Sequence, residues 1–274
     1  MPSINDKFKK LEELLASYGR LAAAFSSGVD SAFLLKTAHD TLGDNAAAVT
    51  AVSPVFPERE RAEAEEFCRR YGIRMLTVEP KLMELEAFKL NPPDRCFHCK
   101  RLLMSTIREA ALKNGFDTVA EGSNLDDMGD YRPGLRALAE LDIKSPLRDA
   151  GLTKADIREL SRQMGLPTWD KPSFACLASR FEYGNPITGG LLNAVAEAED
   201  ILFKAGFRQF RVRVHGRLAR IELLKEDIGS FAESDTAKRI AESLHRNGFM
   251  YITLDLDGFR SGSMNAQVSE RSSK

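Results

Sequence analysis

The chain has 274 residues, 43% of them hydrophobic and 29% charged, which suits one large or two ordinary domains with apolar cores. Its formal net charge of -1 excludes an overall basic field for nucleic acid, and no apolar run is long enough to span a membrane. The N-terminus lacks a signal-peptide pattern, so we expect a cytoplasmic protein. Four cysteines in that setting favour metal binding or chemistry over disulfides.

The first part of the chain, residues 1–186, alternates between predicted strands and predicted helices. Apolar runs predict strands at 21–25, 46–52, 74–78 and 117–120. Apolar residues at helical spacing predict helices at 4–17, 30–43, 57–71, 102–113 and 154–164. This alternation indicates βαβ units, and therefore an α/β domain in which a parallel sheet has helices on both faces and binds ligands at the carboxyl ends of its strands.

The pattern changes after Pro186, where we place a domain boundary. Two further helices are predicted at 191–205 and 235–247, and three strands at 209–215, 218–223 and 251–256. Residues 187–265 are therefore expected to form a small C-terminal α+β domain. The last residues, 266–274, are polar and are expected to be a disordered tail.

A strand, a turn of small residues and a helix follow one another in AAAFSSGVDSAFLL, at 22–35. Such a turn points backbone N–H groups at an anion, and small side chains at Ser26, Ser27 and Gly28 let phosphate oxygens approach the main chain. The hydroxyls of Ser26 and Ser31 can donate to the same oxygens, whereas Asp30 suits Mg²⁺ or orders the turn. The alternative is an ordinary strand-to-helix connection without a ligand.

The turn does not close with the Gly-Lys-Ser/Thr of the common P-loop. It resembles instead the PP-loop, SGGxDS, of the ATP pyrophosphatases, with Ser27 at the second glycine. That resemblance implies that ATP binds here with Mg²⁺, that it is cleaved between its α- and β-phosphates, and that AMP is left on the substrate. ATP would contact residues 26–28, Asp30 and Ser31, together with Ser53 and Gly122 after later strands.

The cysteines leave four interpretations open. Cys96 and Cys99 form a C-x-x-C in a predicted loop that enters a helix, and Cys176 lies in an irregular segment. They could hold a structural zinc with His98 or a distant fourth ligand, form a thioredoxin-like redox pair, have no site, or hold an iron–sulfur cluster by three thiolates. Three thiolates on a 4Fe-4S cluster leave one iron able to bind hydrosulfide. Cys68, in a helical pattern, is expected to be a buried apolar residue.

Five stretches of the chain together carry a resemblance to one known family. They are AFSSGVDS, GDYRPGLRAL at 129–138, ASRFEYG at 178–184, RVRVHGRLARIEL at 211–223 and YITLDLDGFRSGSMN at 251–265. Over nearly its whole length the chain resembles the LarE-type sulfur insertases of nickel-pincer nucleotide cofactor synthesis, and the last two stretches are the most specific because ordinary PP-loop enzymes lack them.

The resemblance implies a pyridinium mononucleotide substrate with two carboxylates. ATP would adenylate a carboxylate, and sulfur would then displace AMP to give a thiocarboxylate. Some members take the sulfur from their own cysteine, which becomes dehydroalanine, whereas others use a cluster. The set Cys96, Cys99 and Cys176 is similar to the cluster type, with Cys176 as a catalytic residue and sulfide or another donor as the sulfur source. The resemblance also implies a homo-oligomer, in particular a hexamer.

Four arginines are candidates for the phosphate of the mononucleotide, because guanidinium forks match phosphate geometry. They are Arg180, Arg211, Arg213 and Arg260. Arg211 and Arg213 lie two apart in a predicted strand and therefore on one face, where they repel each other unless an anion lies between them. The alternative is solvated surface charge.

Two other functions remain as alternatives. A tRNA thiolation enzyme can also join a PP-loop to a three-cysteine cluster, but it needs a basic surface for RNA phosphates, and this chain has 39 Lys+Arg against 40 Asp+Glu. A non-catalytic nucleotide-binding partner protein is supported only by Ser27 in place of glycine.

Overall fold

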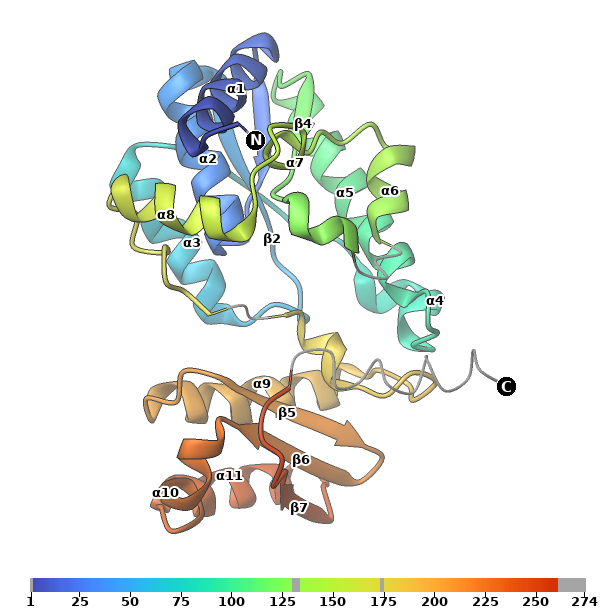
Figure 1. The fold of residues 1–274 in the computed structure, drawn as a ribbon. Helices are drawn as coiled ribbons and strands as arrows, with labels where there is room; N and C mark the ends of the chain where they lie inside the picture. Colours follow the sequence, from blue (N-terminus) through green and yellow to red (C-terminus); the bar gives the residue numbers. More distant parts are fainter. Residues whose placement is uncertain (1, 130–133, 173–174, 261–274) are drawn as a thin grey trace. The chain divides into compact units, whose positions relative to one another are not determined.

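The computed structural model describes residues 2–129, 134–172 and 175–260 (Figure 1). The chain divides into two compact units: residues 1–82 with 96–174, and residues 83–95 with the chain from Ala175 onward. The domain boundary expected near Pro186 therefore lies within the second unit. The polar tail expected at 266–274 lies outside the described residues, as do residues 130–133 and 261–265 of two motifs that carry the resemblance.

The first unit is built on a four-stranded parallel sheet in the order β3-β2-β1-β4. Leu21 at the start of the central strand pairs with Ala46 on one side and with Thr118 on the other. The two central strands consist mostly of buried alanines, whose short side chains let helices pack closely on both faces. The strands are β1 (Leu21–Ala24), β2 (Ala46–Ala51), β3 (Arg74–Val78) and β4 (Thr118–Ala120).

Alternate residues of β1 enter two different apolar clusters, one on each face of the sheet. Ala23 lies in a cluster with Leu11 and Phe33, whereas Ala22 lies in a cluster with Met104 and Ile107. Figure 1 shows α1 and α2 on one side of this sheet and α5 and α6 on the other. The predicted α/β class, with a parallel sheet between helices, is therefore confirmed.

The five helices predicted in the first unit are present in the predicted order, but α5 begins earlier than expected and the short helices α6 and α7 were not predicted. None of the helices within the described ranges is long and apolar enough to cross a membrane. The helices are α1 (Ile4–Ser17), α2 (Val29–Leu42), α3 (Glu58–Tyr71), α5 (Arg95–Lys113), α6 (Gly134–Glu140), α7 (Pro146–Asp149) and α8 (Lys154–Gln163), with short 3₁₀ turns at Gly43–Asn45 and Leu125–Gly129.

Helix α5 begins earlier than predicted, at Arg95 instead of residue 102. Its first turn therefore contains the C-x-x-C sequence that was expected in a loop. The backbone N–H of Arg95 donates to the carbonyl of Pro92 at 2.9 Å, and Phe97 is buried. The run from 95 to 101 contains mostly polar residues and cysteines, so its apolar periodicity is too weak to predict a helix.

The second unit contains a three-stranded sheet in the order β5-β6-β7. Strands β5 (Phe210–His215) and β6 (Leu218–Leu223) form an antiparallel hairpin whose turn needs Gly216 at a φ of 60°. Strand β7 (Tyr251–Leu254) runs parallel to β6 after a crossover that contains the predicted helix and one further short helix. The helices are α4 (Glu86–Lys89), α9 (Gly189–Lys204), α10 (Ile228–Ala232) and α11 (Asp235–Arg246), with 3₁₀ turns at Leu177–Arg180 and Lys225–Asp227.

A short insertion, residues 83–95, joins the second unit through Asn91. The buried side-chain amide of Asn91 donates to the carbonyls of Glu182 and Asn185 at 2.6 and 3.1 Å and accepts from Arg95 at 2.6 Å. Arg95 also donates to the carbonyl of Ala178 at 2.8 Å. The segment just before the C-x-x-C is therefore held within the second unit against the segment that follows Cys176.

Candidate functional site

The turn between β1 and α2 has the geometry expected of a phosphate-binding turn. Ser27 adopts a left-handed backbone with a φ of 54°, and Gly28 precedes the helix in an extended conformation. The left-handed conformation costs a non-glycine residue about 1–2 kcal/mol, which explains why the PP-loop has a glycine at this position. The N–H groups of the first turn of α2 have no partners within the helix and are available to an anion.

The hydroxyls of Ser26 and Ser31 lie together inside this turn. Their oxygens are 3.2 Å apart, and the Ser31 hydroxyl accepts the Ser26 N–H at 3.3 Å while donating to the carbonyl of Gly28 at 3.1 Å. The structure therefore brings together both serines that were predicted to contact phosphate. In the described chain their hydroxyls form hydrogen bonds within the turn.

The carboxylate of Asp30 points toward the N-terminus of α8. It accepts a hydrogen bond from Lys154 Nζ at 2.6 Å and a long one from the Asn124 amide at 3.5 Å. Burial raises the pKa of the Asp30 carboxyl above its usual value, against the lowering effect of the Lys154 ammonium. Sequence reasoning missed Lys154, because nothing in a helix start 124 residues away marks it as a neighbour of Asp30.

Gly122 allows β4 to end directly against the start of α2. A Cβ atom at this position would lie 3.1 Å from the backbone nitrogen of Ser31 and 3.2 Å from the Cβ of Asp30, so larger residues would displace the phosphate turn. The preceding residue, Glu121, is buried and accepts hydrogen bonds from Ser123 and Ser145. Burial acts to raise the pKa of Glu121, but the Lys100 ammonium and these hydrogen bonds hold it below its usual value.

Ser53 follows β2, the strand beside β1, and its side chain is buried. Its hydroxyl has no hydrogen-bond partner among the described residues. A buried hydroxyl without a partner is costly, and it indicates a position where a ligand can supply the missing hydrogen bond. Ser53 thus has the features expected of a nucleotide contact at a strand end.

A second lysine, Lys171, holds the other side of the turn. Its Nζ donates to the carbonyl and the hydroxyl of Ser27 at 3.0 and 3.2 Å and pairs with the carboxylate of Glu63. Arg158 on α8 holds the segment that carries this lysine by donating to the carbonyls of Trp169 and Lys171 at 2.8 and 2.9 Å. No local pattern in the chain predicts these long-range contacts, because Lys171 lies 144 residues from Ser27.

Cys96 and Cys99 lie one helical turn apart at the start of α5, in the first unit, and Cys176 lies just after the second unit resumes. Residues at this helical spacing share one face, and a helix N-terminus stabilises a thiolate. Both a redox pair and a cluster need neighbouring thiolates, so this arrangement is compatible with either. No group of three His, Cys, Asp or Glu residues in the described chain is arranged to hold a metal ion. Cys68 is buried as expected, and burial raises the pKa of its thiol to about 12.

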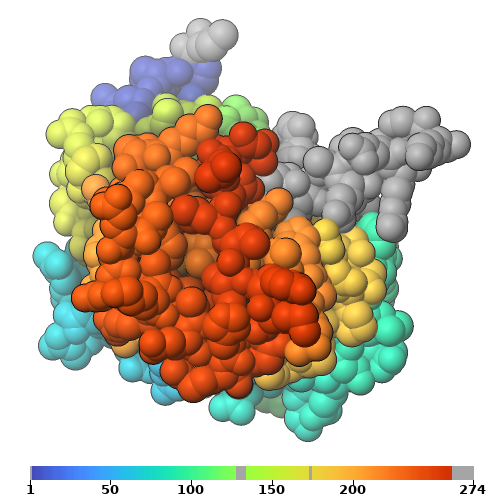
Figure 2. Space-filling view, turned by 90° about the horizontal axis from the view of Figure 1, so that it is seen from below, coloured from blue at the N-terminus to red at the C-terminus, as the bar shows by residue number. Residues whose placement is uncertain are grey.

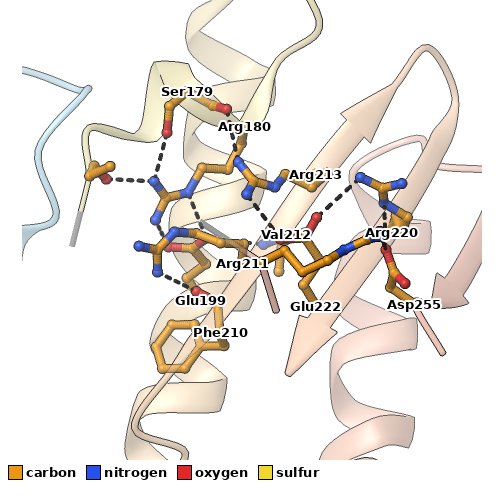
Figure 3. Close-up of polar contacts among 12 residues, drawn as sticks. Ser179, Arg180, Glu199, Phe210, Arg211, Val212, Arg213, Arg220, Glu222 and Asp255 are labelled. Atoms are coloured by element: carbon orange, nitrogen blue, oxygen red, sulfur yellow. Dashed lines mark hydrogen bonds and ion pairs between the residues drawn. The ribbon is translucent and has the colours of Figure 1, made fainter. Parts of the chain in front are cut away.

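The second unit contains a buried cluster of arginines and carboxylates, shown in Figure 3. Arg180 is 0% exposed and forms a bidentate pair with Glu199, with both nitrogen–oxygen distances at 2.8 Å. Its third nitrogen donates to the carbonyls of Ala175 and Cys176 at 2.5 and 3.1 Å and to the Ser179 hydroxyl at 3.0 Å. Arg180 therefore holds the backbone around Cys176 in place.

Arg211 and Arg213 lie on one face of β5, and the strand pairing places Glu222 and Arg220 of β6 opposite them. Arg213 donates to Glu222 at 2.9 Å, and Arg220 donates to the other oxygen of that carboxylate at 3.1 Å. Burial, with the nearby charge of Arg180, lowers the pKa of Arg211 to about 10. The Glu222 carboxylate is thus an anion of the protein itself that lies beside Arg211 and Arg213, where an anion was expected.

Arg260 lies at the margin of this cluster. Its guanidinium is 3.2 Å from Asp257 and 3.9 Å from Asp255, and its side chain is 55% exposed. Asp255 is shared with Arg220 at 3.5 Å. Of the four arginines predicted to bind phosphate, Arg260 is the most accessible, whereas the other three are buried.

No protein-family model matches the chain. Among curated proteins, the pyridinium-3,5-bisthiocarboxylic acid mononucleotide synthase of Lactiplantibacillus plantarum is 38% identical over 272 residues, which cover 98% of each chain. The chain belongs to the LarE-type sulfur insertase family. An uncharacterised protein of Synechocystis is 39% identical over 97% of this chain and all of its own, and one of Methanocaldococcus jannaschii is 27% identical over 94% of this chain.

This match confirms the predicted family and the prediction that the protein is an enzyme. A weaker match, 25% identity over 56% of the chain, links it to an argininosuccinate synthase of Natronomonas pharaonis. The match to the LarE-type relative spans both units, so the phosphate turn and the arginine cluster both fall within the shared sequence.

The geometry predicts that Arg180 is needed for structure. Replacing it with alanine leaves the Glu199 carboxylate buried without its partner, which costs about 3–5 kcal/mol. Hydrogen exchange of the amides of α9 and β5 should show a loss of protection of that size. The control is Arg246→Ala, which removes an exposed ion pair with Glu197, a residue of α9 like Glu199. This change should alter the protection by less than about 1 kcal/mol. Unchanged protection in Arg180→Ala, with weaker binding of the substrate, would instead assign Arg180 to the phosphate.

Proposed function

We propose that this LarE-type enzyme uses ATP to convert a carboxylate of a pyridinium biscarboxylate mononucleotide into a thiocarboxylate, in nickel-pincer cofactor synthesis. The observation that carries this proposal is the match over 98% of both chains to a pyridinium-3,5-bisthiocarboxylic acid mononucleotide synthase. The phosphate turn after β1, which lacks a P-loop lysine, supports the use of ATP.

The reaction follows from the poor leaving group of a carboxylate. A carboxylate oxygen attacks the α-phosphorus of ATP, the bond from that phosphorus to the bridging oxygen breaks, and pyrophosphate leaves. The resulting acyl-AMP has a good leaving group. Sulfur of a sulfide donor then attacks the acyl carbon, AMP departs with the electron pair of the carbon–oxygen bond, and a thiocarboxylate remains. The donor's proton is lost to solvent.

The first unit would hold the ATP. Backbone N–H groups of the turn at 26–28 and of the start of α2 would bind the departing pyrophosphate, because they are fixed before the reaction and point at the developing charge. Ser26 and Ser31 would donate their hydroxyls to it, and Ser53 would contact the nucleotide with its buried hydroxyl. Gly122 keeps this space clear.

Asp30 fits a role in binding Mg²⁺. Its carboxylate lies at the turn, close enough to Asp127 for the two charges to interact, and carboxylate oxygens are the donors that Mg²⁺ prefers. Bound Mg²⁺ would neutralise charge on the phosphates. Asp30 would hold the ion. In the structure, the Lys154 ammonium is the cation that contacts this carboxylate.

Cys96, Cys99 and Cys176 would hold a 4Fe-4S cluster. Cys96 and Cys99 fit two ligand positions, because they share a helix face one turn apart and are partly accessible. Arg180 fixes the backbone at Cys176, as a third ligand requires. When bound, such a cluster would supply sulfide for attack on the activated carboxylate. In its absence Cys176 itself would be the sulfur source.

The arginine cluster would bind the substrate phosphate. Burial and the neighbouring positive charge of Arg180 lower the pKa of Arg211, so an anion bound beside its guanidinium would be stabilised. Arg211 and Arg213 would contact the phosphate from β5, and the exposed Arg260 would close on it.

The homo-oligomer and the cytoplasmic location remain predictions. Residues after about 225, coloured orange to red, form most of the face of the second unit in Figure 2. Met250, Tyr251 and Leu256 of this part are exposed, beside the edge strand β7. Exposed apolar residues at a sheet edge support contact with another copy, and light scattering of the full chain measures the number of copies.

The proposal predicts AMP and pyrophosphate as products of ATP, in amounts that match the thiocarboxylate formed. Asp30→Ala should lower the rate at least about 100-fold by removing the Mg²⁺ ligand. Asp40→Ala is the matched control, because Asp40 lies on the same helix and pairs with Lys36 at 2.5 Å on the surface. Release of ADP, or full activity of Asp30→Ala, would contradict the proposal.

The cluster makes a separate prediction. Each of Cys96→Ala, Cys99→Ala and Cys176→Ala should lose most of the iron bound by the anaerobically purified protein, and double variants should lose little more. Cys68→Ala should keep its iron, since that thiol is buried in the core of the first unit. Iron retained in the single variants, with Cys176 found as dehydroalanine after turnover, would show that the cysteine is sacrificed.

A further inference from the structure

Two lysines from outside the PP-loop motif bracket the phosphate turn. Lys154 contacts Asp30, and Lys171 contacts Ser27, so the two ammonium groups bind residues that precede and follow Gly28 in the chain. Both come from the stretch 154–171, and α8 organises both, since Lys154 is its first residue and Arg158 holds the carbonyl of Lys171.

The two lysines differ in how fully they are engaged. The described residues offer Lys171 three acceptors, namely the carbonyl and hydroxyl of Ser27 and the carboxylate of Glu63. They offer Lys154 one acceptor, a carboxylate oxygen of Asp30. The side chain of Lys154 is 33% exposed and that of Lys171 is 15% exposed. Lys171 therefore supports the conformation of the turn. Lys154 makes fewer hydrogen bonds to the described residues and is more exposed, so its side chain can change partners more easily.

The chemistry of the turn favours a cationic side chain that can reach the leaving group. Cleavage between the α- and β-phosphates releases a strongly anionic pyrophosphate, and the motif has no lysine of its own, unlike a P-loop. The pair between Lys154 and Asp30 is partly exposed, so exchanging it for another anion costs little. Asp30 would in turn be left to bind Mg²⁺.

We propose that Lys154 is the cationic ligand of the β- and γ-phosphates of ATP, and that it leaves Asp30 for these phosphates when the nucleotide and Mg²⁺ enter. The inference rests on the proposed use of ATP and adds the residue that replaces the P-loop lysine. Lys171 stays on Ser27 and keeps the turn in its left-handed conformation. Lys154 is a binding residue for the leaving group.

The test is direct binding, measured by calorimetry on the full chain with Mg²⁺ present. The probes are pyrophosphate, AMP and an ATP analogue with a methylene bridge between the α- and β-phosphates. Lys154→Met should weaken pyrophosphate and the analogue about 10- to 100-fold, as expected for a lost charged hydrogen bond, and leave AMP unchanged. Lys154→Arg should retain most of the affinity. The backbone N–H of Lys154, which donates to Asp126 at 2.8 Å, is unaffected by either change.

Lys7→Met is the matched control. Lys7 also forms a 2.7 Å pair with an aspartate of α8, Asp156, but that carboxylate caps the helix through Thr153 and lies outside the turn. This variant should bind all three probes as the parent does. Parent-like pyrophosphate binding by Lys154→Met, or an equal loss of AMP, overturns the inference. A parent chain that binds the analogue but forms no thiocarboxylate overturns the proposed function alone, because this experiment does not measure sulfur transfer.

Discussion

The close approach of backbone to backbone between the end of β4 and the start of α2 is the constraint on which the turn at 26–31 depends. Gly122 must lack a side chain, because a Cβ atom there would lie 3.1 Å from the nitrogen of Ser31. Ser27 must adopt a left-handed conformation, which Lys171 supports from outside the motif. A site made of main-chain N–H groups can hold a phosphate only if such contacts fix the direction of those groups before the ligand arrives.

The second unit depends on a different constraint, because it buries several arginines beside a small sheet. Glu199 pairs with Arg180, and Glu222 pairs with Arg213 and Arg220, so these three arginines have carboxylate partners. Removing one partner is costly, whereas the complete network holds both the backbone around Cys176 and the guanidinium groups in fixed positions. In the proposed function, the same network that stabilises this unit would also hold the arginines in place for the substrate phosphate.

The parts of the fold that local sequence determines were predictable. The parallel sheet, the hairpin at Gly216 and the turn from Ser26 to Ser31 all follow from patterns of a few residues. The start of α5 was predicted too late, because cysteines and polar residues obscure its periodicity. Lys154 and Glu199 could not be predicted at their sites, since their partners lie 124 and 19 residues away and only tertiary packing brings them together.

Attack of the substrate carboxylate on the α-phosphorus of ATP is the central step of the proposed reaction. The decisive measurement is a turnover with substrate labelled with ¹⁸O in its carboxylates, followed by mass spectrometry of both phosphate products. When sulfur displaces AMP, the carbon–oxygen bond breaks, so each AMP should carry one labelled oxygen and pyrophosphate should carry none. Label in pyrophosphate, or unlabelled AMP alongside newly formed thiocarboxylate, would contradict the account.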